Sequence, residues 1–172
     1  EGQWFGRPSL ISCFVDGVTK PTGAKGNVSG LGAEYGPELR KILGRGFVDL
    51  QARIHKFDWR SADLSAFDVP EEGGIGGVLS VINWWDRVWE EDSYEAMPII
   101  RLASQWLRAN APPIGKVTVI HHDFRAGNFL FDEESGAINA VLDWELAHLG
   151  DYHEDLAWTL QEGYGCRDEQ GR

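Results

Sequence analysis

Cysteine is scarce in this sequence, which contains only Cys13 and Cys166 among its 172 residues. Two cysteines so far apart form neither a disulfide framework nor a pair of metal ligands, so we expect a reducing, cytoplasmic environment. Apolar runs of about 18 residues are also lacking, and the sequence predicts no membrane-spanning helix. The chain begins at Glu1 without an initiator Met, and we expect it to be a fragment.

Positive charge is low relative to negative charge. The chain has 16 Lys and Arg residues against 27 Asp and Glu residues, which gives a formal net charge of -11. An acidic surface disfavours phosphate backbones and anionic lipids, so we expect neither nucleic acid nor a membrane as a partner. Apolar side chains are plentiful by contrast, at 42% of residues with eight Trp. This content predicts a folded domain with a core.

Three stretches have the apolar spacing of amphipathic helices. The first opens at Pro37 and Glu38, residue types that suit the first helical turn, and ends at His55. The apolar positions are Leu39, Ile42, Leu43, Phe47, Leu50 and Ile54 in the first stretch, Val78, Ile82, Trp85 and Trp89 in the second, and Pro98, Ile99, Leu102, Ala103, Trp106 and Leu107 in the third. We expect the Trp residues to be packing anchors in a core.

Strands are predicted where short apolar runs meet turn residues. Residues 9–15 and 117–120 each predict a strand. Residues 129–131 and 141–142 flank the turn cluster at 132–136 and predict a β-hairpin. Residues 20–36 and 58–77 predict loops, and residues 151–160 predict a helix with acids in its first turn.

The predicted hairpin brings together the side chains that carry chemistry. It places the loop with Asp123 and Asn128 beside Asp143, so that two carboxylates and one amide converge at one sheet edge. Such groups suit phosphoryl transfer, in which an acid orients and deprotonates a hydroxyl and oxygen ligands hold Mg²⁺ on the phosphates. The spacing from His121 through Asp123 to Asn128 also matches the kinase catalytic loop.

A metal-based alternative uses partly the same residues. His121 and Asp123, with His148 or His153, have the residue types of the His-x-Asp…His triad of non-haem iron oxygenases. That chemistry usually occurs in a barrel of many strands, whereas this sequence has three amphipathic helical stretches and few predicted strands. We therefore favour phosphoryl transfer.

The longer pattern resembles a specific family. The segments His-x-Asp-Phe-Arg-x-Gly-Asn at 121–128, Leu-Asp-Trp-Glu at 142–145 and Gly-Asp-x-x-x-Asp-Leu-Ala at 150–157 are similar to those of the aminoglycoside phosphotransferase (choline kinase-like) family. One feature departs from the family's pattern, because His122 stands where the family usually has Gly. Relative to protein kinases in general, Trp144 with Glu145 replaces the usual Phe-Gly.

The resemblance implies an α+β fold, namely a protein-kinase-like C-terminal lobe that is mainly helical with a small β-hairpin carrying the catalytic loop. It implies a hinge strand over residues 1–17 and an incomplete helical lobe over 18–172, with the catalytic loop at 119–131 and a metal-binding segment at 141–145. The N-terminal lobe has no counterpart in this sequence. We therefore expect the chain alone to bind ATP weakly and to self-associate through exposed apolar surface.

The resemblance also implies roles for single residues. Asp123 would be the base, and Arg125 would face the transferring phosphate or pair with Glu145 or Asp151. Asn128 and Asp143 would bind Mg²⁺ and contact the nucleotide. The hinge backbone at Cys13, Phe14 and Val15 would bind adenine. His121, Asp155 and His55 would have structural roles.

The expected function is transfer of the γ-phosphate of ATP, with Mg²⁺, to a hydroxyl of a small molecule. The acceptor stays open among aminoglycosides, choline-like amines and hydroxyacyl-CoA, because the segment 106–112 is similar to kinase-like domains fused to acyl-CoA dehydrogenases. The alternative is a kinase-like binding module without activity, or an inactive fragment of such a kinase. The set Asp123, Asn128 and Asp143 is complete, which argues against degeneration.

Overall fold

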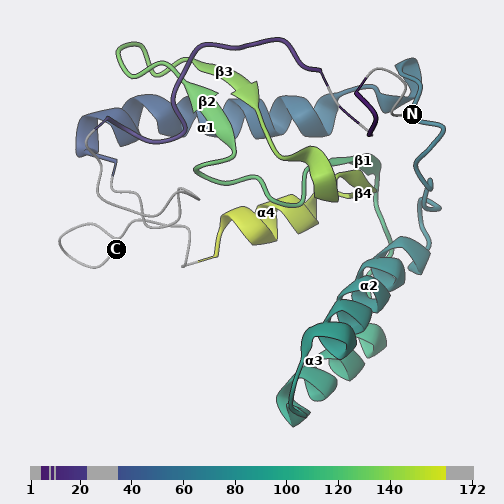
Figure 1. Cartoon of the computed structure of the whole chain (residues 1–172). Helices are drawn as coiled ribbons and strands as arrows, with labels where there is room; N and C mark the ends of the chain where they lie inside the picture. The colour runs from purple at the N-terminus through teal and green to yellow at the C-terminus, as the bar shows by residue number, and fades with distance from the viewer. Residues whose placement is uncertain (1–4, 8, 10, 23–34, 162–172) are drawn as a thin grey trace.

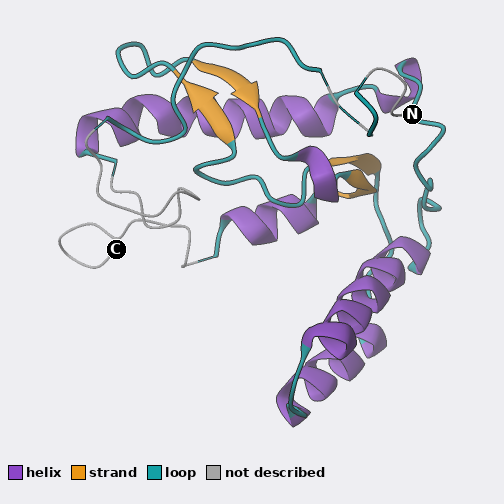
Figure 2. Ribbon diagram, in the orientation of Figure 1, coloured by secondary structure: helices purple, strands orange, loops and turns teal. Residues whose placement is uncertain are grey.

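The computed structural model describes residues 5–7, 9, 11–22 and 35–161, and within them it confirms the predicted α+β fold. Figure 1 shows the helix α1 (Pro37–Lys56) running along the hairpin of β2 (Phe129–Phe131) and β3 (Ile138–Val141). The helices α2 (Gly76–Asp92) and α3 (Pro98–Ala109) form a hairpin that projects from the sheets, as the colouring of Figure 2 makes clear. None of the described helices combines the length and apolarity that crossing a membrane requires.

The helix α1 begins at Pro37, as the sequence predicts, because Pro at the start of a helix loses no intrahelical hydrogen bond. Leu43 on its inner face is buried and belongs to a core cluster with Phe131 of β2. Gln51 is also buried, and its Nε2 donates to Thr159 Oγ1 at 2.9 Å. α1 therefore supports the hairpin at one point and α4 (His153–Thr159) at another.

The predicted hairpin is confirmed. β2 and β3 pair antiparallel, with Phe129 opposite Val141 and a register shift before Phe131. Beyond the strand end, the amide of Leu142 donates to the carbonyl of Asn128 at 2.8 Å. The hairpin thus continues to the residue that precedes Asp143, so the two predicted metal-binding segments are neighbours.

A second strand pair was predicted only in part. β1 (Val117–Ile120) has the predicted bounds, and it pairs antiparallel with β4 (His148–Asp151), where the sequence predicted no strand. Leu149 is the apolar residue of β4 that joins the buried cluster of Val117 and Ile114. β4 therefore depends on long-range pairing with β1, because its own sequence, His-Leu-Gly-Asp, has little strand preference.

The predicted hinge strand at residues 9–15 is wrong for its described residues, none of which lies in a strand. A strand requires a hydrogen-bonded neighbour, and the side chains here are open to solvent, with Phe14 89% exposed. Pairing starts later, at Val18, which exchanges two backbone hydrogen bonds with Phe131 at 2.9 and 3.0 Å. The predicted loop at 20–36 lies largely outside the described residues.

The α2–α3 hairpin confirms the second and third predicted helices. Asp86 of α2 accepts hydrogen bonds from Ser104 and Arg108 of α3, both at 2.6 Å. The loop before α2, predicted at 58–77, contains a short 3-10 helix at Trp59–Ser61.

The apolar stripe on α3 does not form a core with the described residues, contrary to the prediction. Ile99, Leu102 and Trp106 are 63%, 62% and 63% exposed. The stripe shows that these positions share one face of the helix, but amphipathic spacing alone does not identify what covers that face.

Replacing Gly136 by Ala should destabilise the chain by about 1–3 kcal/mol. Gly136 lies in the β2–β3 turn with φ +68°, and a methyl group there would collide with the side chain of Ile42 on α1. Gly73→Ala is the matched control, because Gly73 also has a positive φ of +83° but open space around it. Urea unfolding should show the larger loss for Gly136→Ala, and equal losses would mean that the contact with α1 is unimportant.

Candidate active site

Asp155 of α4 binds the backbone of the loop that follows β1. The Asp155 carboxylate accepts hydrogen bonds from the amide of His121 at 3.0 Å, the amide of His122 at 2.7 Å and the ring of His55 at 2.8 Å. Asp155 is fully buried. Burial by itself would raise the pKa of Asp155, but the hydrogen bonds from His55 and from the two loop amides outweigh it and hold the pKa below its ordinary value. This geometry agrees with structural roles for Asp155 and His55.

His121 connects the loop to the segment before Asp143. Its Nδ1 accepts from the amide of Asp123 at 3.2 Å, so its Nε2 carries the proton and donates to the carbonyl of Leu142 at 2.8 Å. The ring is fully buried and also packs against Trp144, with ring centroids 4.6 Å apart. With both nitrogens used by the backbone, His121 is a scaffold and cannot also be an iron ligand, which removes the basis of the oxygenase alternative.

Asp123 is the most strongly oriented side chain of the loop. Its Oδ1 accepts from Arg125 Nε at 2.9 Å and from Trp158 Nε1 at 3.0 Å. Its Oδ2 accepts from Asn128 Nδ2 at 2.6 Å. The carboxylate is about one-sixth exposed, at 16%, so three donors fix its orientation while one face still meets solvent.

Arg125 pairs with Asp123, which was not among the partners expected from the sequence, namely a phosphate, Glu145 or Asp151. Besides pairing with Asp123, it donates from Nη1 to the carbonyl of Ala126 at 3.2 Å. Its side chain is 13% exposed. Arg125 therefore positions the Asp123 carboxylate, and its predicted role toward a phosphate stays a prediction.

Asn128 presents its amide in a defined direction. The carbonyl of Asp123 can only accept, so the group that contacts it at 2.9 Å must be the Nδ2 of Asn128. The same nitrogen contacts the Asp123 carboxylate. The amide oxygen is the other end of this planar group and is turned away from Asp123, and its predicted binding of a metal ion stays a prediction.

Asp143 lies just beyond β3 and not within a strand. Its backbone is left-handed, with φ 65° and ψ 54°, and it precedes the short 3-10 helix at Trp144–Leu146. Its side chain is exposed. The hydrogen bond between Leu142 and Asn128 places the Asp143 backbone next to the Asn128 segment, and a shared metal stays a prediction.

The predicted hinge residues do not join this group in the described structure. Cys13, Phe14 and Val15 are exposed. Farther along, Asp16 and Val18 run beside the β2–β3 hairpin, where Asn139 Nδ2 donates to the carbonyl of Asp16 at 3.0 Å. Their predicted contact with adenine stays untested.

One residue of the site was missed from the sequence, namely Trp158, whose indole donates to Asp123, the predicted base. Asp155, Trp158 and Thr159 are spaced by three and four residues, so they share one face of α4. Thr159 Oγ1 also donates to the carbonyl of Phe124, at 3.1 Å. This spacing could have identified Trp158 from the sequence, because a residue three positions after a loop-binding acid lies on the same helix face and therefore near the same loop.

The sequence model of the phosphotransferase enzyme family matches residues 25–172. Among curated relatives, acyl-CoA dehydrogenase family member 11 of Gallus gallus is 32% identical over 129 residues, which cover 74% of this chain and 16% of the relative. Acyl-CoA dehydrogenase family member 10 of Mus musculus is 28% identical over 128 residues, covering 74% of this chain and 12% of the relative. The chain thus spans less than a fifth of either relative.

Solved structures show the same fold. A protein from Ralstonia eutropha, provisionally named an aminoglycoside phosphotransferase, has a TM-score of 0.64 at 22% identity, covering 86% of this chain and 42% of its own. Macrolide 2'-phosphotransferase type I has a TM-score of 0.56 at 15% identity, covering 76% of this chain and 44% of its own. Since the family match covers most of the sequence and the fold agrees, the chain belongs to the phosphotransferase enzyme family.

Proposed function

We propose that this chain serves the Mg²⁺-dependent transfer of the γ-phosphoryl group of ATP to a hydroxyl of a small molecule. The observation that carries the proposal is the Asp123 carboxylate, fixed by three donors in the loop after β1 with Asn128 beside it. A carboxylate held in this way can orient an acceptor hydroxyl and take its proton as the new O–P bond forms.

The hydrogen bonding of Asp123 leaves room for that step. An ionised carboxylate has about four acceptor positions, and the donors from Arg125, Asn128 and Trp158 occupy three of them. Arg125 and Trp158 both donate to Oδ1, which keeps the carboxylate from rotating. The remaining capacity of the carboxylate can accept the hydroxyl proton.

Asn128 and Asp143 fit a Mg²⁺ ion by their chemistry. Mg²⁺ prefers oxygen ligands and is usually held by one or two carboxylates together with substrate phosphates. Asn128 offers an amide oxygen turned away from Asp123, and Asp143 offers an exposed carboxylate on the adjoining segment. When bound, the ion would neutralise charge on the β- and γ-phosphates.

The acceptor is the open part of the proposal. The names of the solved structures refer to aminoglycosides and macrolides, and those of the curated relatives refer to acyl-CoA dehydrogenases. A screen of aminoglycosides, macrolides, choline-like amines and hydroxyacyl-CoA with the full-length gene product, reading ADP release, would select among them. The alternative of a binding module without activity predicts no acceptor-dependent ADP release in any of these assays.

Asp143→Asn should lower Mg²⁺-supported turnover by at least about a hundredfold, because a lost carboxylate ligand removes several kcal/mol of charge stabilisation. Asp132→Asn is the control, since Asp132 is an exposed acid at the turn of the same hairpin. Turnover is measured against Mg²⁺ concentration. An Asp143→Asn variant with the same Mg²⁺ dependence as the native protein would remove Asp143 from the metal site.

A further inference from the structure

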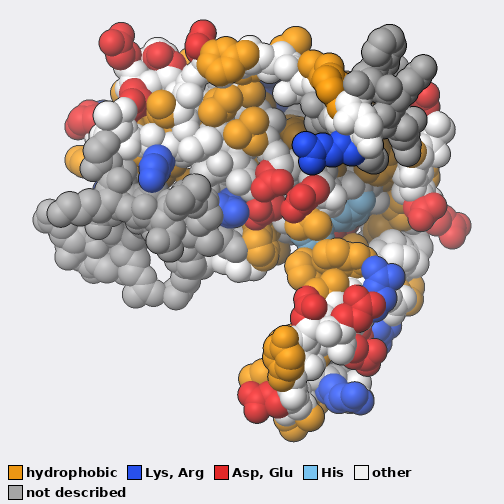
Figure 3. Space-filling model, in the orientation of Figure 1, with side chains coloured by type: hydrophobic (Ala, Val, Ile, Leu, Met, Phe, Trp, Pro, Cys, Tyr) orange, Lys and Arg blue, Asp and Glu red, His pale blue; other side chains and the backbone are white. Residues whose placement is uncertain are grey.

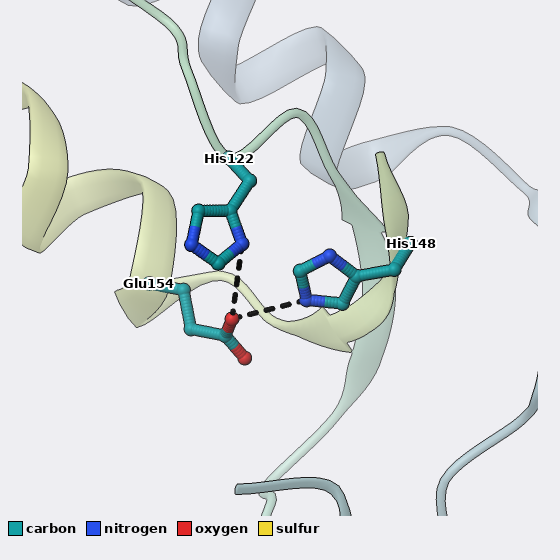
Figure 4. A group of neighbouring side chains, drawn as sticks. All are labelled: His122, His148 and Glu154. Carbon is teal, nitrogen blue, oxygen red and sulfur yellow. Dashed lines mark hydrogen bonds and ion pairs between the residues drawn. The ribbon is translucent and has the colours of Figure 1, made fainter. Parts of the chain in front are cut away.

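A cluster of two histidines and one glutamate lies beside the catalytic loop. Glu154 Oε2 is 3.0 Å from His148 Nε2 and 3.8 Å from His122 Nδ1, and one donor atom from each residue lies within 4.8 Å of the others. Figure 4 shows the three side chains turned toward one another from the loop after β1, from β4 and from the start of α4. The cluster shares no residue with the predicted base or the predicted Mg²⁺ ligands.

We propose that His122, His148 and Glu154 bind a divalent transition-metal ion, Zn²⁺ by preference, which joins the catalytic loop to β4 and α4. Imidazole nitrogen and carboxylate oxygen bind Zn²⁺ at about 2.0–2.2 Å, so ligand atoms of a tetrahedral site lie about 3.4 Å apart. The two separations at Glu154, 3.0 and 3.8 Å, lie on either side of that value. Small side-chain rotations therefore suffice to close the site around an ion.

The groups around His148 favour its use as a ligand. His148 Nδ1 lies 3.0 Å from the carbonyl of Leu146, to which it can donate, and this leaves Nε2 to face the ion. A ligand His held through its other nitrogen in this way is typical of zinc sites. Gly150 provides the space, since a methyl group there would lie 2.9 Å from Glu154 Oε1 and 3.1 Å from His148 Nε2.

The backbone of His122 is held in an unusual conformation that aims its ring at the cluster. Its φ is +67°, in the left-handed region that residues other than Gly seldom adopt. The hydrogen bond from its amide to Asp155 and the contact of its ring with Trp85, at 5.9 Å between centroids, hold it there. Strained residues of this kind concentrate at functional sites.

The cluster is accessible to an ion from solvent. The side chains of His122, His148 and Glu154 are 13%, 28% and 19% exposed. Figure 3 shows histidine side chains at the surface, beside acidic side chains and near the base of the α2–α3 hairpin. Three protein ligands leave a fourth position for water, as in open zinc sites. Imidazole ligands disfavour Mg²⁺, so this site is chemically distinct from the one proposed at Asn128 and Asp143.

Calorimetric titration of the chain with Zn²⁺, in excess Mg²⁺ and with Cys13 and Cys166 replaced by Ser to remove competing thiols, tests the proposal. His122→Gly removes one ligand while suiting the left-handed backbone, and Glu154→Gln removes another without changing its size. His153→Ala is the control, because His153 neighbours Glu154 but is 68% exposed and lies outside the cluster. Circular dichroism confirms that each variant is folded.

We expect one Zn²⁺ per chain, a thermal midpoint that rises with Zn²⁺, and unchanged affinity in His153→Ala. Losing a residue that only hydrogen-bonds to a metal ligand lowers metal affinity by about 10–100-fold, so the Zn²⁺ affinity of each ligand variant should fall at least tenfold. Co²⁺ in place of Zn²⁺ should give the visible absorption of a tetrahedral site, and this absorption should vanish in both ligand variants. Failure of the folded chain to bind Zn²⁺, or equal affinity in the ligand variants and the control, would overturn the proposal.

Discussion

Asp123→Asn in the full-length gene product should lower kcat by about 10²–10⁴-fold while leaving the KM for ATP close to its native value. Asn occupies the same volume but cannot take a proton from the acceptor hydroxyl. The residues predicted to bind ATP are others, so nucleotide binding should persist. The donors that now orient the carboxylate, Arg125, Asn128 and Trp158, would also face an amide in place of one oxygen.

The control for this variant is Asp49→Asn. Asp49 is an exposed acid on α1 whose ion pair with Arg45 is open to solvent, with the Asp49 side chain 70% exposed. Its loss should change stability and activity little, since exposed pairs contribute about 0–1 kcal/mol. If Asp123→Asn kept near-native turnover with its acceptor, Asp123 would not be the base.

Asp155→Asn should destabilise the chain by about 3–5 kcal/mol, the usual effect of breaking a buried charged network by changing one partner. The two loop amides of His121 and His122 each require an oxygen of Asp155, and Asn has only one to offer. The other amide would face an NH₂ group and remain unpaired. Urea unfolding is the measurement, with the exposed acid variant Asp68→Asn as the control expected to stay within about 0.5 kcal/mol.

The stabilisation by Asp155 should also depend on pH with a definite sign. The pKa of Asp155 is depressed in the folded chain, so in acid this carboxylate binds fewer protons in the folded chain than in the unfolded chain. The stabilisation is therefore complete above the unfolded-state pKa of about 3.9 and is lost as the pH falls through the folded-state pKa. The difference in stability between the native chain and Asp155→Asn should be constant near neutral pH and shrink in acid. A difference that instead grew in acid would contradict the depressed pKa.

Local sequence predicted the elements that local chemistry controls. α1 starts at Pro37, and the β2–β3 hairpin forms around a turn cluster, because both depend on neighbouring residues. β4 was missed because a strand made of His148, Leu149, Gly150 and Asp151 forms through its partner β1, which lies about thirty residues earlier. The predicted strand at 9–15 failed for the opposite reason, since apolar residues there found no partner among the described residues.

The candidate site also contains some features that neighbouring residues determine and others that depend on the fold. The residues of the predicted catalytic loop were recognisable because the motif is contiguous, and the supporting acid Asp155 followed from the family resemblance. The pairing of Arg125 with Asp123 depends on side-chain geometry that spacing does not determine. The cluster of His122, His148 and Glu154 draws its ligands from three elements without a local spacing pattern, so only the fold brings it together.

We propose above that Asn128 and Asp143 share one Mg²⁺ on the ATP phosphates beside Asp123. A crystal structure of the full-length gene product with Mg²⁺ and a non-hydrolysable ATP analogue tests it most directly. We expect one Mg²⁺ with the Asn128 amide oxygen and an Asp143 carboxylate oxygen each about 2.1 Å away. A nucleotide complex in which these side chains point to opposite faces of the hairpin, with the ion held elsewhere, would contradict it.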